Sequence, residues 1–152
     1  MLPHLTTTET MEELKFLGGI RLRILLPTAA TNGTVAVFED IVEPGIGPGR
    51  HIHHGEDETF FVMEGQFAFE ADGKRMEAGT GDVLFVPKGT VHAFKNTGTT
   101  QGRLRYMFTP AGPVEAMFRA FHAADAKGDL TPEKMAEIAQ DFDQSFVGPP
   151  LD

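Results

Sequence analysis

Glycine and proline divide most of this chain into short segments. The frequent recurrence of these turn-forming residues restricts the fold more than any other feature. The sequence contains 17 Gly and 10 Pro residues, spread mainly through its first three quarters. They bound short runs of alternating or continuous apolar residues, a rhythm typical of β-strands joined by turns. We therefore expect an all-β fold.

Nine segments are the expected strands, with boundaries accurate to a few residues. They are Gly19–Leu26, Thr34–Val42, Arg50–His53, Glu58–Met63, Gln66–Glu70, Lys74–Glu77, Val83–Val86, Val91–Lys95 and Gly102–Phe108. An Asp-Gly pair, Asp72-Gly73, separates the fifth from the sixth, and such a pair favours a tight hairpin because glycine tolerates positive φ. These two strands should therefore pair antiparallel.

The hydrophobic period changes after Pro113, where apolar residues begin to recur at the spacing of one helix face. The residues with this spacing are Val114, Met117, Phe118 and Phe121 in a first helix, and Met135, Ile138 and Phe142 in a second. Gly128 is a stop signal, and Thr131-Pro132 supplies a hydroxyl cap and a proline at the first helical position. We expect two C-terminal helices over about residues 113–147, the second ending near Gly148.

Length and composition fit one soluble domain over residues 1–152, with the barrel at about 14–109. The net charge of -9 disfavours nucleic acid, whose phosphates would be repelled. No stretch approaches the ~18 apolar residues of a membrane helix, and the start resembles no targeting signal. We expect a cytoplasmic protein with no nucleic acid and no membrane partner.

The chain contains no Cys, which excludes disulfides, thiolate metal sites and thiol nucleophiles. Any metal ion must therefore be bound by nitrogen and oxygen. The sequence contains a His-x-His motif, followed after four residues by Glu. These residues are His51, His53 and Glu58, and they offer ligands of this kind. Side chains two apart on a strand point to the same face, so both imidazoles can converge on one ion, with Glu58 returning on the next strand.

A second motif supplies the fourth ligand. The segment from Gly81 to Asn96 predicts a strand, a Pro-Lys-Gly turn and another strand that opens with His92. Three imidazoles and a carboxylate suit one divalent ion of Fe, Mn, Ni, Co, Cu or Zn, and they leave coordination positions open for water or substrate. The sequence predicts one such ion per chain, bound by His51, His53, Glu58 and His92.

Both motifs resemble those of the cupin family, which have the forms G-x5-H-x-H-x3-4-E-x6-G and G-x5-P-x-G-x2-H-x3-N. The matching positions are Gly45, His51, His53, Glu58 and Gly65 in the first, and Gly81, Pro87, Gly89, His92 and Asn96 in the second. The resemblance covers residues 33–108 and, more loosely, 113–151, which are similar to the tail of small single-domain bacterial cupins of the quercetin-dioxygenase-like type. It implies a double-stranded β-helix or jelly-roll barrel, these metal ligands, and a homodimer.

Other polar residues near the motifs have simpler interpretations. His54 points away from the ligand face by strand parity. Glu56 has the wrong spacing for a ligand, and we expect it to be solvated in the turn with Asp57. His4 and His122 are expected to be uninvolved, one near a terminus and one on the polar side of a helix.

Aromatic and basic residues also allow two interpretations. Five phenylalanines fit inward positions of a packed barrel: Phe60, Phe67, Phe69, Phe85 and Phe94. Phe60, Val62 and Phe94 are the candidates to line a pocket beside the metal ion. Arg103 and Arg105 share a strand face, where they could bind an anionic substrate or lie on a solvated outer surface.

Three functions are compatible with such a site. The first, which we favour from sequence, is a dioxygenase-type oxidoreductase in which the metal ion binds an oxygen-bearing organic molecule and O2 reacts with it. The second is a non-redox isomerase or cyclase that uses the ion as a Lewis acid. The third is a binding module for a sugar or another small molecule. The sequence identifies no catalytic base, and nothing in it resembles a DNA-reading helix-turn-helix.

Overall fold

The computed structural model describes residues 1–16 and 18–152. The strands in these residues are β1 (Glu12–Phe16), β2 (Ile20–Leu26), β3 (Ala36–Val42), β4 (His51–His53), β5 (Asp57–Glu64), β6 (Gln66–Ala71), β7 (Lys74–Gly79), β8 (Val83–Val86), β9 (His92–Asn96), β10 (Gly102–Thr109) and β11 (Gln144–Phe146). The helices are α1 (Val114–Ala126), α2 (Pro132–Gln140) and a short 3-10 helix, Thr28–Thr31.

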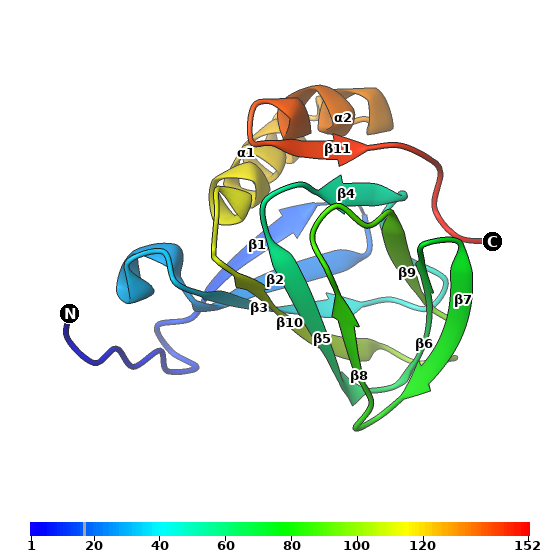
Figure 1. Cartoon of the computed structure of the whole chain (residues 1–152), viewed down its shortest axis with the longest axis horizontal. Coiled ribbons are helices and arrows are strands. Elements are labelled where there is room, and N and C mark those ends of the chain that lie inside the picture. Colours follow the sequence, from blue (N-terminus) through cyan, green and yellow to red (C-terminus); the bar gives the residue numbers. More distant parts are fainter. Residues whose placement is uncertain (17) are drawn as a thin grey trace.

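Two antiparallel sheets face each other and enclose the core, as Figure 1 shows. One sheet has the strand order β1-β2-β3-β10-β5-β8, and the other has the order β11-β4-β9-β6-β7. Neighbours that are distant in sequence, such as β3 and β10, pair along their whole length. This arrangement confirms the expected all-β, double-stranded β-helix fold.

The expected β6–β7 hairpin is confirmed. Ala71 pairs with Lys74, and the two residues between them, Asp72 and Gly73, have φ values of 52° and 75°. Two consecutive positive φ values are those of a type I′ turn, whose twist matches the twist of the strands it joins.

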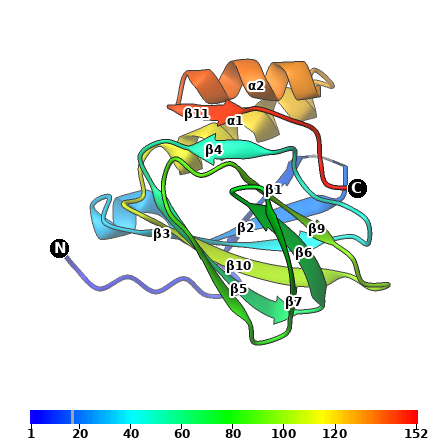
Figure 2. The ribbon, with the colours of Figure 1, turned by 45° about the vertical axis from the view of Figure 1, so that its right-hand side comes forward.

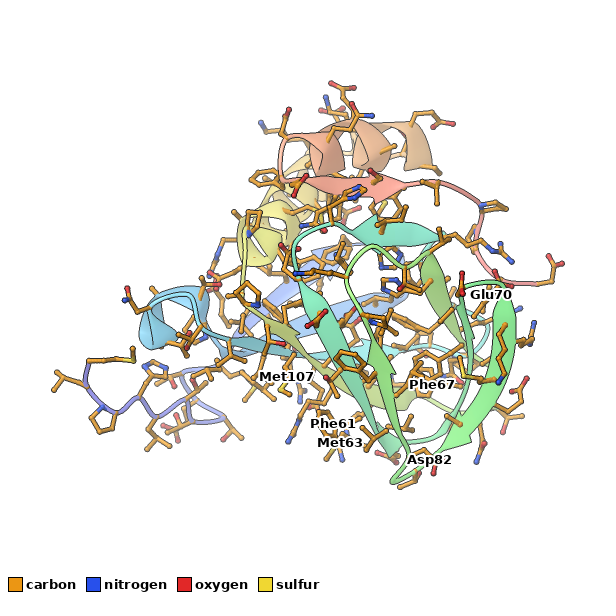
Figure 3. All side chains as sticks on the ribbon, viewed as in Figure 1. Phe61, Met63, Phe67, Glu70, Asp82 and Met107 are labelled. Carbon is orange, nitrogen blue, oxygen red and sulfur yellow. The ribbon has the colours of Figure 1, made fainter. Side chains whose placement is uncertain are left out.

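Alternation of side chains along the strands builds the core, and β10 is the clearest case. Leu104, Tyr106 and Phe108 point inward and are at most 3% exposed. Arg103 and Arg105 point outward and pair with Glu39 at 3.3 and 3.2 Å, so they belong to the outer surface. Figure 3 shows Met107 and, from β5, Phe61 on this outer side of the sheet.

One of the five phenylalanines predicted to lie in the core does not. Phe85 does not point inward but is 57% exposed, because Leu84 and Val86 take the inward positions of β8. Phe60, Phe67, Phe69 and Phe94 are buried as expected.

The second helix ends earlier than expected. α2 stops at Gln140, and Asp143 adopts a left-handed φ of 58° that a helix cannot continue through. The chain then forms β11, which pairs with β4 and so gives this short strand a second neighbour. Phe142 consequently lies beyond the helix, although it still packs against the core.

The segment from α1 to β11 covers one end of the barrel, next to β4 (Figure 2). We call it the cap, residues 114–146. Its apolar side chains continue the barrel core, among them Met117, Phe118 and Phe121 of α1 and Met135 of α2. In the described part of the chain, neither helix has the length and apolar character needed to cross a membrane.

Candidate metal centre

Three strands from the two sheets bring the four predicted ligands together. β4 carries His51 and His53, and His51 lies directly opposite His92 on β9. Glu58 enters from β5 in the other sheet. One ligand atom from each of the four residues lies within 4.8 Å of the others, in a cluster able to hold a metal ion.

Each imidazole is held by a hydrogen bond at Nδ1. His51 Nδ1 lies 2.7 Å from the carbonyl oxygen of Gly49, and His92 Nδ1 lies 2.9 Å from that of Thr90. His53 Nδ1 lies 2.6 Å from the amide oxygen Oε1 of Gln144. Because all three partners only accept hydrogen bonds, each Nδ1 carries a proton, so that in the neutral ring Nε2 keeps its lone pair for a metal ion.

Burial and neighbouring charges shift pKa values within the cluster. The four side chains are at most 9% exposed. Burial opposes ionisation of Glu58, but its interactions with His53 and His92 outweigh this effect and lower its pKa to about 2. Burial and the neighbouring imidazoles His92 and His53 keep the pKa of His51 well below its usual value. The centre therefore offers a carboxylate together with a neutral imidazole, which are the forms that bind metals.

The vicinity of Glu58 fits a bound cation. His92 Nε2 lies 2.9 Å from Glu58 Oε1. In the neutral form of the ring, with its proton at Nδ1, the imidazole and the carboxylate present lone pairs to each other, and a cation between them would relieve this contact. His53 Nε2 is buried and lies 3.2 Å from the same carboxylate oxygen, without the geometry of a hydrogen bond. A divalent ion would satisfy all of these atoms, so the residues present fit the predicted metal.

The other motif residues shape the backbone around the centre. Asn96 closes the turn after β9, since its side chain donates to the carbonyl oxygens of Val42 and Thr100 and accepts from Gly98. The four motif glycines all have positive φ, where side chains are strained. They are Gly45, Gly65, Gly81 and Gly89.

An apolar cavity of about 50 Å³, partly open to solvent, adjoins the cluster, and its volume admits several water molecules. Strands and cap both line it, and its walls are largely aromatic. The lining residues include His51, His53 and Glu58 with Phe16, Ile20, Asp40, Phe94, Tyr106, Phe108, Phe118, Phe121 and Phe146. None of the described lining residues is Lys or Arg.

The predicted pocket residues separate into two groups. Phe94 lines the cavity, whereas Phe60 and Val62 lie in the core outside its lining. His54 points away from the cluster, as expected, and its Nε2 lies 2.8 Å from the hydroxyl oxygen of Ser145.

The expectation for Glu56 is wrong. Its side chain is not solvated but is 3% exposed, and it accepts a hydrogen bond of 2.7 Å from Gln144 Nε2. The turn bends this carboxylate toward the cap, which is a long-range contact that local spacing does not reveal. His4 and His122 lie outside the cluster, each hydrogen-bonded elsewhere.

Asp40 and Tyr106 form a buried polar pair in the cavity that the sequence did not identify. Tyr106 donates its hydroxyl proton to Asp40 Oδ1 over 2.8 Å, and both residues line the cavity. Burial raises the pKa of Asp40 to about 8, and the charges of Glu58 and Glu39 add to this effect. The only sequence signal is an acidic residue at an inward position of an apolar strand, and its position depends on a register that the sequence does not give.

Comparisons with known proteins agree with this geometry. The family model for the Cupin domain matches residues 38–109, which contain all four cluster residues. The chain is 32% identical over 84 residues to an oxalate-binding protein of Thermotoga maritima, an alignment that covers 55% of this chain and 69% of the relative. It is 25% identical over 131 residues to the polyketide synthase CurC of Streptomyces cyaneus, covering 85% of this chain and 84% of CurC.

Two further comparisons cover different shares of the chain. The quercetin 2,3-dioxygenase of Bacillus subtilis is 33% identical over 88 residues, which are 57% of this chain but 26% of that enzyme. A structure of Streptomyces PAC13 with uridine superposes with a TM-score of 0.65 at 18% identity, over 99% of this chain and 95% of PAC13. The last match includes the cap, and it shows likeness of fold alone. With its two motifs, its barrel and these relatives, the chain belongs to the cupin family.

Proposed function

We propose that this protein is a metal-dependent enzyme of the isomerase or cyclase type, which rearranges a small, neutral, oxygen-bearing organic compound by proton transfer. The observation that carries the proposal is the buried Asp40–Tyr106 pair, which shares one aromatic cavity with the metal ligands. A buried carboxyl beside the metal ligands can act as an acid and a base, which a rearrangement by proton transfer requires.

His51, His53, Glu58 and His92 would hold one divalent ion beside the cavity. When bound, the ion supplies a Lewis acid that polarises a carbonyl oxygen of the substrate. The surrounding phenylalanines exclude water and so strengthen electrostatic interactions in the site.

Asp40 would be the catalytic acid and base. In the metal-free protein burial raises its pKa to about 8. In the protonated form the carboxyl can donate a proton to an oxygen of the substrate. Once ionised, the same carboxylate can accept a proton from a carbon beside the polarised carbonyl, which restores its starting form. Tyr106 orients Asp40 through its hydrogen bond and is a positioning residue.

The cavity walls support a neutral substrate with an apolar body. The described lining residues offer rings and aliphatic groups but no cationic side chain to bind a carboxylate or phosphate. The long alignment with CurC is consistent with an aromatic or polyketide-like compound. A dianion such as oxalate would depend on the metal ion alone.

A dioxygenase-type reaction is the second candidate. The similarity to the quercetin 2,3-dioxygenase favours it, as do ligands that suit a redox-active ion in a water-poor pocket. The same aromatic substrates would enter the same cavity, so the two candidates differ in metal identity and in the need for O2.

The metal centre is tested by elemental analysis of the purified protein. We expect about one divalent ion per chain, lost in a His51→Ala, His53→Ala double variant because two of four ligands are removed. A His54→Ala variant is the matched control and should keep its metal. Full metal content in the double variant would overturn the metal centre.

The reaction type is tested on a panel of aromatic β-dicarbonyl compounds and flavonols, with Zn- and Fe-loaded protein, in air and under argon. The proposal expects products of unchanged mass, or lacking one water, formed with Zn and without O2. Asp40→Asn should lower their rate by about 10²–10⁴-fold, while an Asp82→Asn control at the far turn leaves it unchanged. Products that gain two oxygen atoms, formed only with Fe and O2, would establish the dioxygenase instead.

A further inference from the structure

We propose that β11 is an outer layer of the metal centre, in which Gln144 positions His53 and Glu56 positions Gln144. This inference rests on the metal centre proposed above and not on the reaction. Neither Gln144 nor Glu56 occupies a fixed position of the two motifs that contain the ligands.

Gln144 connects the cap to a ligand through a fully buried hydrogen bond. The residue is 2% exposed, and its Oε1 lies 2.6 Å from His53 Nδ1. An amide oxygen only accepts hydrogen bonds, so this contact holds the proton at Nδ1 and directs the Nε2 lone pair into the cluster. Loss of the contact would free the ring to rotate or to adopt the other tautomer, whose Nε2–H cannot bind a metal.

The orientation of the Gln144 amide is itself determined. Nε2 donates to Glu56 Oε1 over 2.7 Å and to the carbonyl oxygen of Phe142 over 3.0 Å. Both partners are acceptors, so a rotated amide would place its oxygen against two oxygens and its NH2 against the N–H of His53. Glu56 therefore determines which end of the amide faces the ligand.

The strand makes a second contact with the centre. The ring of Phe146 stacks on that of His51, with centroids 5.3 Å apart and planes inclined by 28°. Ser145 points to the other face of β11, where its hydroxyl oxygen contacts the non-ligand His54. Two of the three residues of β11 thus support ligands, and the third provides a matched control.

Exchanging the amide and the carboxylate between positions 144 and 56 distinguishes a positioning role from a general effect on protein stability. Gln144→Met removes both polar groups, and Gln144→Glu places two carboxylates against each other. Either change should weaken metal binding by about 10- to 100-fold. In the Glu56→Gln, Gln144→Glu double variant the new amide at position 56 donates to the new carboxylate at position 144, which still accepts from His53 Nδ1. We expect this double variant to bind more tightly than Gln144→Glu alone but less tightly than wild type, because the carbonyl oxygen of Phe142 still lacks its donor.

Binding is measured with Co(II), by competition with a chromophoric chelator and by the d–d absorption spectrum of the bound ion. Both single variants should alter the spectrum as well as the affinity, and Ser145→Ala should change neither. Wild-type affinity in Gln144→Met, or a double variant no better than Gln144→Glu alone, would overturn the inference. Failure of the wild-type protein to bind Co(II) would instead overturn the metal centre itself.

Discussion

At the scale of single residues, the chemistry of this protein depends on how buried polar atoms are paired. The two motifs predicted all four cluster residues: His51 and His53 share a strand face, and Glu58 and His92 open later strands. They could not predict Asp40 or Gln144, since their partners lie 66 and 91 residues away in the chain. Local periodicity carries no information about such pairs.

Asp40 leads to a prediction about pH and stability in the metal-free protein. Its pKa rises from 3.8 to about 8 on folding, so between these values the folded state retains a proton that the unfolded state releases. The free energy of unfolding should therefore fall as pH rises through this window. Asp40→Asn removes the titrating proton and should flatten the profile.

Urea unfolding at about pH 5 and pH 8 measures this effect for the metal-free proteins. We expect the variant to gain stability relative to wild type as the pH increases. Parallel profiles for the two proteins would show that Asp40 is already ionised in the folded state. Asp82→Asn, at an exposed position, is the control.

At the scale of elements, the inner strands of the sheets were predictable, whereas two strands at their outer edges were not. All nine expected strands exist, because each alternates or is bounded by Gly and Pro. β1 and β11 were missed. β11 has three residues, Gln144, Ser145 and Phe146, and it is a strand because β4 offers an edge to pair with. Pairing of this kind is a tertiary effect that overrides local preference.

The loop that leads into β4 gives an element-scale prediction. A Cβ atom at Gly47 would lie 1.8 Å from the carbonyl oxygen of Phe94. Backbone hydrogen bonds from Gly45 to Asn96 and from Asn96 to Ile46 hold this loop against β9. Gly47→Ala must therefore separate the loop from β9, and we expect it to lower the free energy of unfolding by about 1–3 kcal/mol.

Thermal unfolding of Gly47→Ala, with Gly55→Ala as the control, measures this cost. The control adds a Cβ whose nearest neighbour is 3.8 Å away, an ordinary contact. Equal stability of the two variants would contradict the close approach. The metal affinity of Gly47→Ala should also fall, because the displaced loop continues directly into His51.

At the scale of the whole molecule, the barrel has an apolar core that does not depend on the metal. Its largest fully buried side chains include Phe38, Phe60, Phe67, Phe69 and Phe108, which extend well beyond the cluster. Burial of such rings contributes about 1.5–3 kcal/mol each. The homodimer and the cytoplasmic location stay predictions, because they concern neighbours rather than the fold of one chain.

We therefore predict that chelation lowers the melting temperature modestly and leaves the barrel folded. A bound metal ion stabilises the folded state by an amount that depends only on the concentration of the ion and its affinity for the site. Circular dichroism before and after treatment with a strong chelator measures the change, and readdition of metal should reverse it. Complete unfolding on chelation would show that the ion is structural.

The cap has a kinetic consequence. It forms one wall of the cavity of about 50 Å³, and its strand β11 contacts His53 through Gln144. A compound larger than this cavity needs the lining side chains to move, and a movement that displaces β11 would break the hydrogen bond between Gln144 and His53. Substrate entry and exit should therefore shorten the residence time of the metal ion. We expect the protein to lose metal faster during turnover than in the absence of substrate.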